Sequence, residues 1–271
     1  IALVRIRRVH TMTEIVSTFN ISKLEQFLLI MTRITSFIFI SPVFGMSNVP
    51  ARVKVGLGVM VSFLLYGVLE YQIPEYTSLI DYAGLVVLEC IAGLILGFGA
   101  YICTTIILFA GSVIDMEIGL SMATQFDPMT KTQASILGSF YQYMILILMI
   151  LSDMHLYLLK TLADSYQLIP IGKLMFGSSM YSTVVGFLGQ YIILGFRIAL
   201  PVFAAMLLVN IIMGVLAKAA PQMSMFAVGI QIKLFVGLAV VYLTATLLPD
   251  MADMVFEQIR LMLTELLRGM M

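Results

Sequence analysis

Three carboxylates interrupt a strongly apolar part of the sequence, in the stretch VIDMEIGLSMATQFDP at residues 113–128. They are Asp115, Glu117 and Asp127, and they follow an uncharged run at 90–114. Carboxylates that act together can carry out general acid–base catalysis. Asp115 and Glu117 are two residues apart, however, and side chains with this spacing point in different directions on a helix. The spacing therefore does not favour a paired acid–base site.

Ser121, in the same stretch, raises the alternative of an intramembrane protease in which His155 is the base. A serine nucleophile needs a base within hydrogen-bonding reach and a third group that orients the base. Nothing else in the sequence supports such a set, and HExxH, CxxC and glycine-rich phosphate-loop motifs do not occur. We therefore predict a protein with no catalytic site, no cofactor and no metal ion.

The composition favours a membrane protein. Of the 271 residues, 61% are hydrophobic and 11% are charged, whereas soluble domains are about half apolar and a quarter charged. A soluble fold of this length could not bury so much apolar surface. The net charge is zero and the basic residues are scattered, which argues against nucleic acid as a partner.

The uncharged runs predict an all-α fold. Helices of about 20 apolar residues cross a bilayer, and several runs qualify: 90–114, 132–152, 174–196 and 198–217. Helix breakers cluster at 41–50, 72–76, 126–129, 168–172, 219–223 and 248–251, and two of these turns lie between apolar runs with little polar loop. This pattern indicates membrane-associated helical hairpins with tilted and broken helices. Ile1 is not an ordinary initiator whereas Met12 can be one, so we interpret residues 1–11 as a non-native or upstream extension and expect a single domain over 12–271.

Four charged residues stand alone within or between apolar runs, namely Arg33, Glu89, Arg197 and Lys233. An isolated charge at bilayer depth is costly and is usually paired or faces water. We expect these residues to pair with one another or to cap neighbouring helices inside an assembly. A proton or ion relay is the alternative, but such relays gather several acids in one span. Because Pro201 follows Arg197, we expect a bent helix with the guanidinium group in a buried, paired site.

Small residues and methionines suggest how the helices pack. Gly93 and Gly97 have the spacing that lets two helices approach closely, either within the chain or between subunits. Segment 111–128 is either a connecting loop or a movable closure, because its glycines reach unusual backbone angles and its methionines repack at low cost. Asp127 and Pro128 are expected to end this segment, with Asp127 as the cap of the next helix.

Five stretches carry a resemblance to a known family: PVFGMSNVPARVKVGLGVMV (42–61), GLILGFGA (93–100), AGSVIDMEIGLSMATQFDP (110–128), LIPIG (168–172) and APQMSMFAVGIQIKLFVG (220–237). In this order they resemble the FliR family of the flagellar export gate, and more distantly its counterparts in virulence-associated type III secretion. The resemblance covers roughly residues 12–260. GLSMA with the following DP, and APQMS, are its most specific parts.

The resemblance implies a non-enzymatic core subunit of the flagellar type III export gate, in the bacterial inner membrane at the flagellar basal body. It implies a FliP-like part followed by a FliQ-like hairpin, present as one copy in a complex with FliP and FliQ. FlhB would surround the closed gate, FlhA would dock nearby, and exported flagellar proteins and membrane lipid would be the other contacts.

The resemblance also implies roles for individual residues. Segment 111–128 corresponds to the family's plug, which obstructs the export channel, and its plug or gate residues are Gly111, Asp115, Met116, Glu117, Gly119, Leu120, Ser121, Met122 and Phe126. Glu117 departs from the expected pattern, in which a neutral residue such as Gln stands at this position.

Other residues are assigned to assembly and packing: Arg33, Pro42, Arg52, Lys54, Glu89, Gly93, Gly97, Asp127, Pro128, Arg197, Pro221, Gln222 and Lys233. The alternative function is a secondary transporter with a midplane site built from broken helices. The sequence shows no inverted repeat and no cluster of polar groups that would support it.

Overall fold

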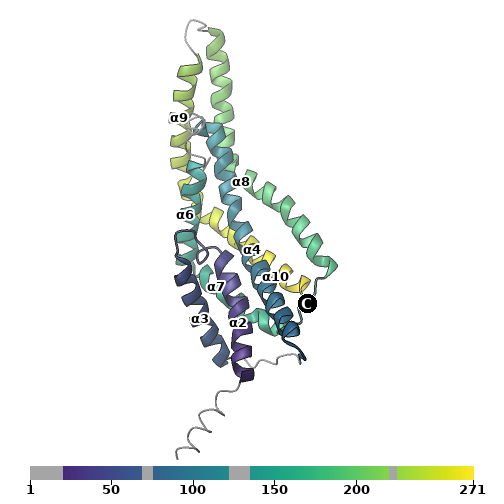
Figure 1. The fold of residues 1–271 in the computed structure, drawn as a ribbon. Coiled ribbons are helices and arrows are strands. Elements are labelled where there is room, and N and C mark those ends of the chain that lie inside the picture. Colours follow the sequence, from purple (N-terminus) through teal and green to yellow (C-terminus); the bar gives the residue numbers. More distant parts are fainter. Residues whose placement is uncertain (1–20, 69–75, 122–134, 220–224) are drawn as a thin grey trace, which may run out of the picture. The chain divides into compact units, whose positions relative to one another are not determined.

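The computed structural model describes residues 21–68, 76–121, 135–219 and 225–271 (Figure 1). In this part of the chain every regular element is helical: α2 (Ile21–Ile40), α3 (Ala51–Val68), α4 (Leu79–Ile118), α6 (Ile136–Leu151), α7 (Met154–Leu168), α8 (Ser178–Ala219), α9 (Met225–Thr244), the 3-10 helix η1 (Ala245–Leu247) and α10 (Leu248–Gly269). The predicted all-α class is confirmed.

Four described helical stretches are long and apolar enough to cross a membrane: Ala51–Val68, Leu79–Ile118, Met180–Ala219 and Val228–Gly269. Helices α6 and α7 form a further candidate, bent by 70°. The break lies at Ser152 and Asp153, where Asp153 has a φ of 57°. The sequence did not predict this break, because neither proline nor glycine marks it. By length and composition, the helices support a membrane-embedded protein.

The chain divides into two compact units. One unit consists of Ile1–Phe98, Leu159–Gly177 and Leu267–Met271, and the other of Gly99–Leu158 and Ser178–Leu266. Three helices, α4, α7 and α10, contribute residues to both units. The single domain over residues 12–271 stays a prediction.

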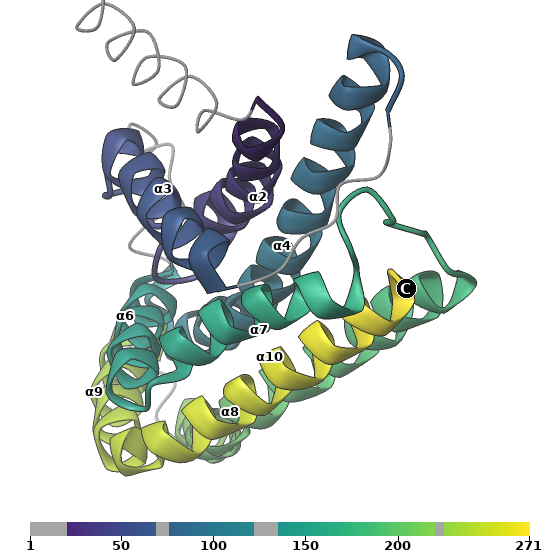
Figure 2. The same cartoon turned by 90° about the horizontal axis from the view of Figure 1, so that it is seen from below.

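In the first unit, α2 and α3 pack side by side as a hairpin, which both views show (Figures 1 and 2). The predicted turn at 41–50 joins them. Gly45 has no room for a side chain, because a Cβ atom there would lie 2.7 Å from the carbonyl oxygens of Phe39 and Ser41. Lys54 is buried and donates a hydrogen bond from Nζ to the Gly45 carbonyl oxygen at 2.9 Å. The turn is therefore stabilised by the close backbone contact at Gly45 and by the hydrogen bond from the Lys54 ammonium group.

Helix α4 packs closely on α2 in the same unit. A Cβ atom on Gly93 would lie 2.2 Å from the Arg33 carbonyl oxygen, and one on Gly97 would lie 2.9 Å from that of Phe37. Only glycine permits backbones to approach in this way. Of the two interpretations of this glycine pair, the structure shows packing within the chain.

In the second unit, α8 and α9 form another hairpin. Helix α8 continues through Pro201 and changes direction along its length (Figure 1), in agreement with the predicted bend. Helix α10 buries an apolar face that includes Val255, Ile259 and Leu263, and it exposes charged residues such as Glu257.

Candidate functional site

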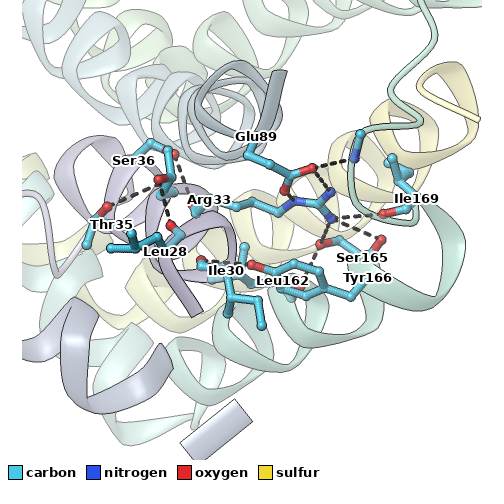
Figure 3. Close-up of polar contacts among 12 residues, drawn as sticks. Leu28, Ile30, Arg33, Thr35, Ser36, Glu89, Leu162, Ser165, Tyr166 and Ile169 are labelled. Atoms are coloured by element: carbon cyan, nitrogen blue, oxygen red, sulfur yellow. Dashed lines mark hydrogen bonds and ion pairs between the residues drawn. The ribbon is translucent and has the colours of Figure 1, made fainter. Parts of the chain in front are cut away.

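Arg33 of α2 and Glu89 of α4 form a buried ion pair in the first unit (Figure 3). Arg33 Nε lies 2.6 Å from Glu89 Oε2, and Arg33 Nη2 donates to Glu89 Oε1 at 3.0 Å. Each side chain is only 1% exposed. Two of the four solitary charges therefore pair with each other, as the sequence predicts, and the bidentate geometry is that of a strong charge-assisted contact.

The end of α7 and the turn after it complete this ion pair. Arg33 Nη1 donates to the Ser165 hydroxyl at 3.3 Å and to the Ile169 carbonyl oxygen at 3.1 Å. Glu89 Oε1 also accepts a hydrogen bond from the Gly172 amide at 2.9 Å. We call Arg33, Glu89, Ser165, Ile169 and Gly172 the Arg33 cluster. It joins three helices and the following turn, so it acts as a structural tie.

An aromatic ring covers the guanidinium group of the cluster. The Arg33 Cζ atom lies 4.2 Å from the centre of the Tyr166 ring. The Tyr166 hydroxyl donates to the Ile30 carbonyl oxygen at 3.0 Å, which fixes the ring against α2. A cation over an aromatic face gains further stabilisation when both groups are shielded from water.

The first of the predicted plug carboxylates is a structural anchor. Asp115 is 4% exposed, and its carboxylate accepts hydrogen bonds from Ser135 Oγ at 2.8 Å and from the Leu137 amide at 3.2 Å. Ser135 is the N-cap of α6 and its Oγ accepts from the Gly138 amide at 2.8 Å. A carboxylate at a helix N-terminus is favoured by the exposed amides and by the helix dipole. Asp115 thus fastens the end of α4 to the start of α6.

Gly111 does not serve as the hinge that the sequence suggested. It lies inside α4, and a Cβ atom on it would be 2.1 Å from the Gly138 Cα atom. Helix α4 extends to Ile118 because Ala110, Ile114 and Ile118 continue its buried face. The start of the predicted plug is therefore a packed helix and not a loop.

Gly119 is the point at which the backbone leaves α4. Its φ is +93°, and its amide donates to the Asp115 carbonyl oxygen at 3.0 Å. Glycine commonly ends a helix in this left-handed conformation, because it has no Cβ atom. Gly119 therefore adopts a backbone angle that other residues avoid, and its part in a movable closure stays a prediction.

The remaining plug residues fall into two groups. Met116 is 71% exposed, and Glu117, Leu120 and Ser121 are half-buried. The other two plug residues, Met122 and Phe126, lie outside the described residues. Four of the assembly residues also lie outside them, namely Asp127, Pro128, Pro221 and Gln222. The next described helix, α6, begins at Ile136 with Ser135 as its cap.

The other assembly residues differ in their surroundings. Pro42 is buried in the turn after α2, Arg52 is exposed on α3, and Lys233 is half-buried in α9. Arg197 is not buried within the chain itself, so its expected burial in a paired site stays a prediction. Its side chain is exposed, and the described part of the chain supplies it with no hydrogen bond or ion pair. The reason is that Arg197 lies on an outward side of α8, near the exposed side chains of Ile193 and Leu200.

Comparison with known proteins identifies the family. Residues 24–259 match the sequence model described as bacterial export proteins, family 1. The chain is 31% identical over 256 residues to the flagellar biosynthetic protein FliR of Pectobacterium carotovorum subsp. carotovorum, which covers 92% of this chain and 97% of that protein. The chain belongs to the FliR family. FliR of Bacillus subtilis (strain 168) is 31% identical over 78% of the chain and 82% of its own length, and FliR of Escherichia coli (strain K12) is 27% identical over 87% and 90%.

Membership in the FliR family gives the chain a role in the flagellar export apparatus. The names of these FliR relatives describe flagellum biosynthesis and not a reaction. Among the residues with described positions, His, Cys, Asp and Glu form no group of three or more that could hold a metal ion. The family supports the export interpretation over the transporter alternative.

The sequence did not reveal several polar partners in this FliR-family chain. Ser165 of the Arg33 cluster lies within α7, and no local pattern distinguishes it. Gly172 belongs to the helix-breaking stretch at 168–172, but nothing in that stretch indicates that its amide donates to Glu89. Ser135 had a usable signal, because a serine directly before an apolar run is a typical N-cap. Outside the candidate spans, Tyr76 donates a hydrogen bond to the Glu25 carboxylate, and this bond raises the pKa of Tyr76 above its ordinary value.

Proposed function

We propose that this FliR-family chain is a non-enzymatic core subunit of the flagellar type III protein export gate, in the inner membrane at the basal body. It joins FliP and FliQ as one copy, with its α8–α9 hairpin as the FliQ-like part. FlhB and FlhA are its further neighbours, and exported flagellar proteins are the cargo that passes the gate.

The observation that carries this proposal is the apolar helix surface that the chain leaves uncovered. On α3, Met60, Phe63 and Leu64 are 61%, 71% and 59% exposed. On α8, large exposed apolar side chains continue from Tyr181 to Leu216. Contiguous apolar surface of this extent is typical of sites that contact lipid or other proteins. Partner subunits and lipid cover it in the proposed complex.

The end of α4 supports a role in closing the channel. Asp115 fixes this end of α4 against the start of α6. Gly119 directs the backbone out of the helix after this anchor, and Met116 faces outward.

Deletion of residues 119–122 tests the closing role while leaving Asp115 and its contacts in place. The variant is co-expressed with FliP and FliQ, and both complex recovery and leakage of small solutes from the cells are measured. We expect an assembled complex and a leaky membrane. The wild-type chain and Lys160→Met, which alters an exposed side chain of α7, serve as controls.

The two measurements separate the parts of the proposal. An assembled complex with a tight membrane would show that segment 111–128 only connects helices. A wild-type chain that is monodisperse alone and is not recovered with FliP and FliQ would contradict the gate role and favour the transporter alternative.

A further inference from the structure

Arg197 stands in a stripe of exposed residues on the first part of α8. The stripe consists of Gly186, Gln190, Ile193, Arg197 and Leu200, all of them exposed. Their spacing of four, three, four and three residues places them on one side of a helix. Ile193 and Leu200, on either side of the arginine, are 62% and 60% exposed. We call these five residues the α8 face.

The length of α8 determines what can cover this face. At 1.5 Å per residue, the exposed apolar side chains from Tyr181 to Leu216 span about 50 Å. The hydrocarbon core of a bilayer is only about 30 Å thick. Lipid therefore covers all of this surface only if the bent helix lies strongly inclined in the membrane.

Both arrangements of α8 require a protein beside Arg197. If lipid covers the whole helix, Arg197 lies roughly 24 Å from Tyr181 and 28 Å from Leu216 along the helix, deep in hydrocarbon. An unpaired guanidinium group is costly there, and it needs an anionic partner. If lipid covers only part of the helix, the exposed apolar side chains outside that part need a protein cover, and Arg197 lies among such side chains, between Ile193 and Leu200.

We propose that the α8 face binds a transmembrane helix of a partner subunit that presents a carboxylate to Arg197. The inference rests on the proposed function, because it assumes a subunit of a hetero-oligomer. Gly186 lets the partner helix approach closely because it has no side chain. The space beside it is open, since a Cβ atom there would meet nothing within 4 Å. Gln190, one heptad from Arg197, supplies a second polar contact on the same side. A second copy docked by the same face is disfavoured, because it would bring two guanidinium groups together.

The test uses the full-length, tagged chain co-expressed with FliP and FliQ. Recovery of the complex is measured for Arg197→Lys, Arg197→Leu and Arg197→Glu, relative to the amount of tagged chain in the membrane. We expect Arg197→Lys to retain most of the complex and Arg197→Leu to lose about two- to threefold. Arg197→Glu should lose at least about tenfold, because it opposes two carboxylates in a dry contact.

Two further variants control for folding and for charge. Gly186→Leu fills open space in this chain, so it should leave the abundance of the chain unchanged but reduce complex recovery. Lys160→Glu makes the same charge reversal on an exposed residue of α7 and should assemble as wild type does. Changing Asp and Glu residues in the apolar helices of FliP and FliQ to Lys, one at a time, should identify a change that restores assembly with Arg197→Glu.

The outcomes distinguish this inference from the proposed function. Full recovery of the complex with both Arg197→Glu and Gly186→Leu would overturn the docking role of the α8 face and leave the gate subunit intact. Recovery that falls for Arg197→Glu only in membranes that contain anionic lipid, and equals wild type in membranes depleted of it, would assign Arg197 to lipid headgroups and also overturn the inference. Failure of the wild-type chain to assemble with FliP and FliQ would contradict the proposed function, and the inference with it.

Discussion

The buried ion pair between Arg33 and Glu89 provides a stringent test of how the first unit is held together. Replacing Arg33 by Met keeps much of the side-chain volume but removes the cation. The Glu89 carboxylate then keeps, among the described groups, only the Gly172 amide as a donor. Replacing Glu89 by Leu has a milder effect, because the guanidinium group retains the oxygen acceptors at Ser165 and Ile169.

The size of each effect follows from burial. Both side chains are 1% exposed, and removing one partner of such a pair costs about 3–5 kcal/mol. We expect Arg33→Met near the upper limit and Glu89→Leu near the lower limit. The double variant leaves no unpaired charge, so its cost should be smaller than the sum of the two by roughly 2–3 kcal/mol.

Thermal unfolding of the purified chain in detergent measures these differences. Since 1 kcal/mol shifts the melting temperature of a protein of about this size by roughly 2–4 °C, each single variant should melt on the order of 10 °C lower. Lys160→Met, an exposed change on α7, should melt within about 2 °C of wild type. Single variants that melt like wild type, or strictly additive effects in the double variant, would refute the role assigned to the pair.

Three further predictions concern α4. Gly97→Leu should lower the free energy of unfolding by about 1–3 kcal/mol, because the new side chain meets the Phe37 backbone. Gly84→Leu, on the open side of α4, is the control. Equal melting temperatures of the two variants would contradict the close packing at Gly97. Asp115→Ala should lower the free energy of unfolding by about 1–3 kcal/mol, because it leaves the buried Leu137 amide without its carboxylate acceptor. Ser135→Ala should cost less in the Asp115→Ala variant than in the wild-type chain. Full additivity of the two changes would show that the two residues do not act together. Gly119→Ala should cost about 1–2 kcal/mol in the thermal assay, since an alanine is strained at φ +93°, and an unchanged melting temperature would mean that this conformation is not maintained.

The sequence predicts those parts of the fold that depend on local chemistry. The turn at 41–50 follows from its two prolines and Gly45, and the bend of α8 follows from Pro201. The expectation that the solitary charges are paired follows from the cost of an isolated charge in an apolar run. The sequence could not predict which of the four solitary charges pair, because that choice depends on how helices far apart in the chain meet.

The end of α4 shows which roles the sequence alone could not assign. Gly111 and Gly119 have the same freedom in isolation, but they have different roles. Gly111 faces the backbone of α6 and permits close packing, whereas Gly119 adopts the left-handed conformation that ends the helix. Tertiary contact decides between these roles. For the same reason Asp115, predicted as part of a plug, is a buried anchor for α6.

The charged groups of Arg33, Asp115 and Arg197 differ in whether the chain itself supplies their polar partners, and this difference bears on assembly. Arg33 is satisfied by Glu89 and by the oxygen atoms of Ser165 and Ile169, and Asp115 is satisfied by the start of α6. The folded chain therefore meets the polar requirements of these two groups without a partner. Arg197 is exposed on an apolar helix, and the described residues leave its requirement unmet. A charge that is costly in the separate chain and paired in the complex favours assembly and discriminates against partner surfaces that lack a carboxylate.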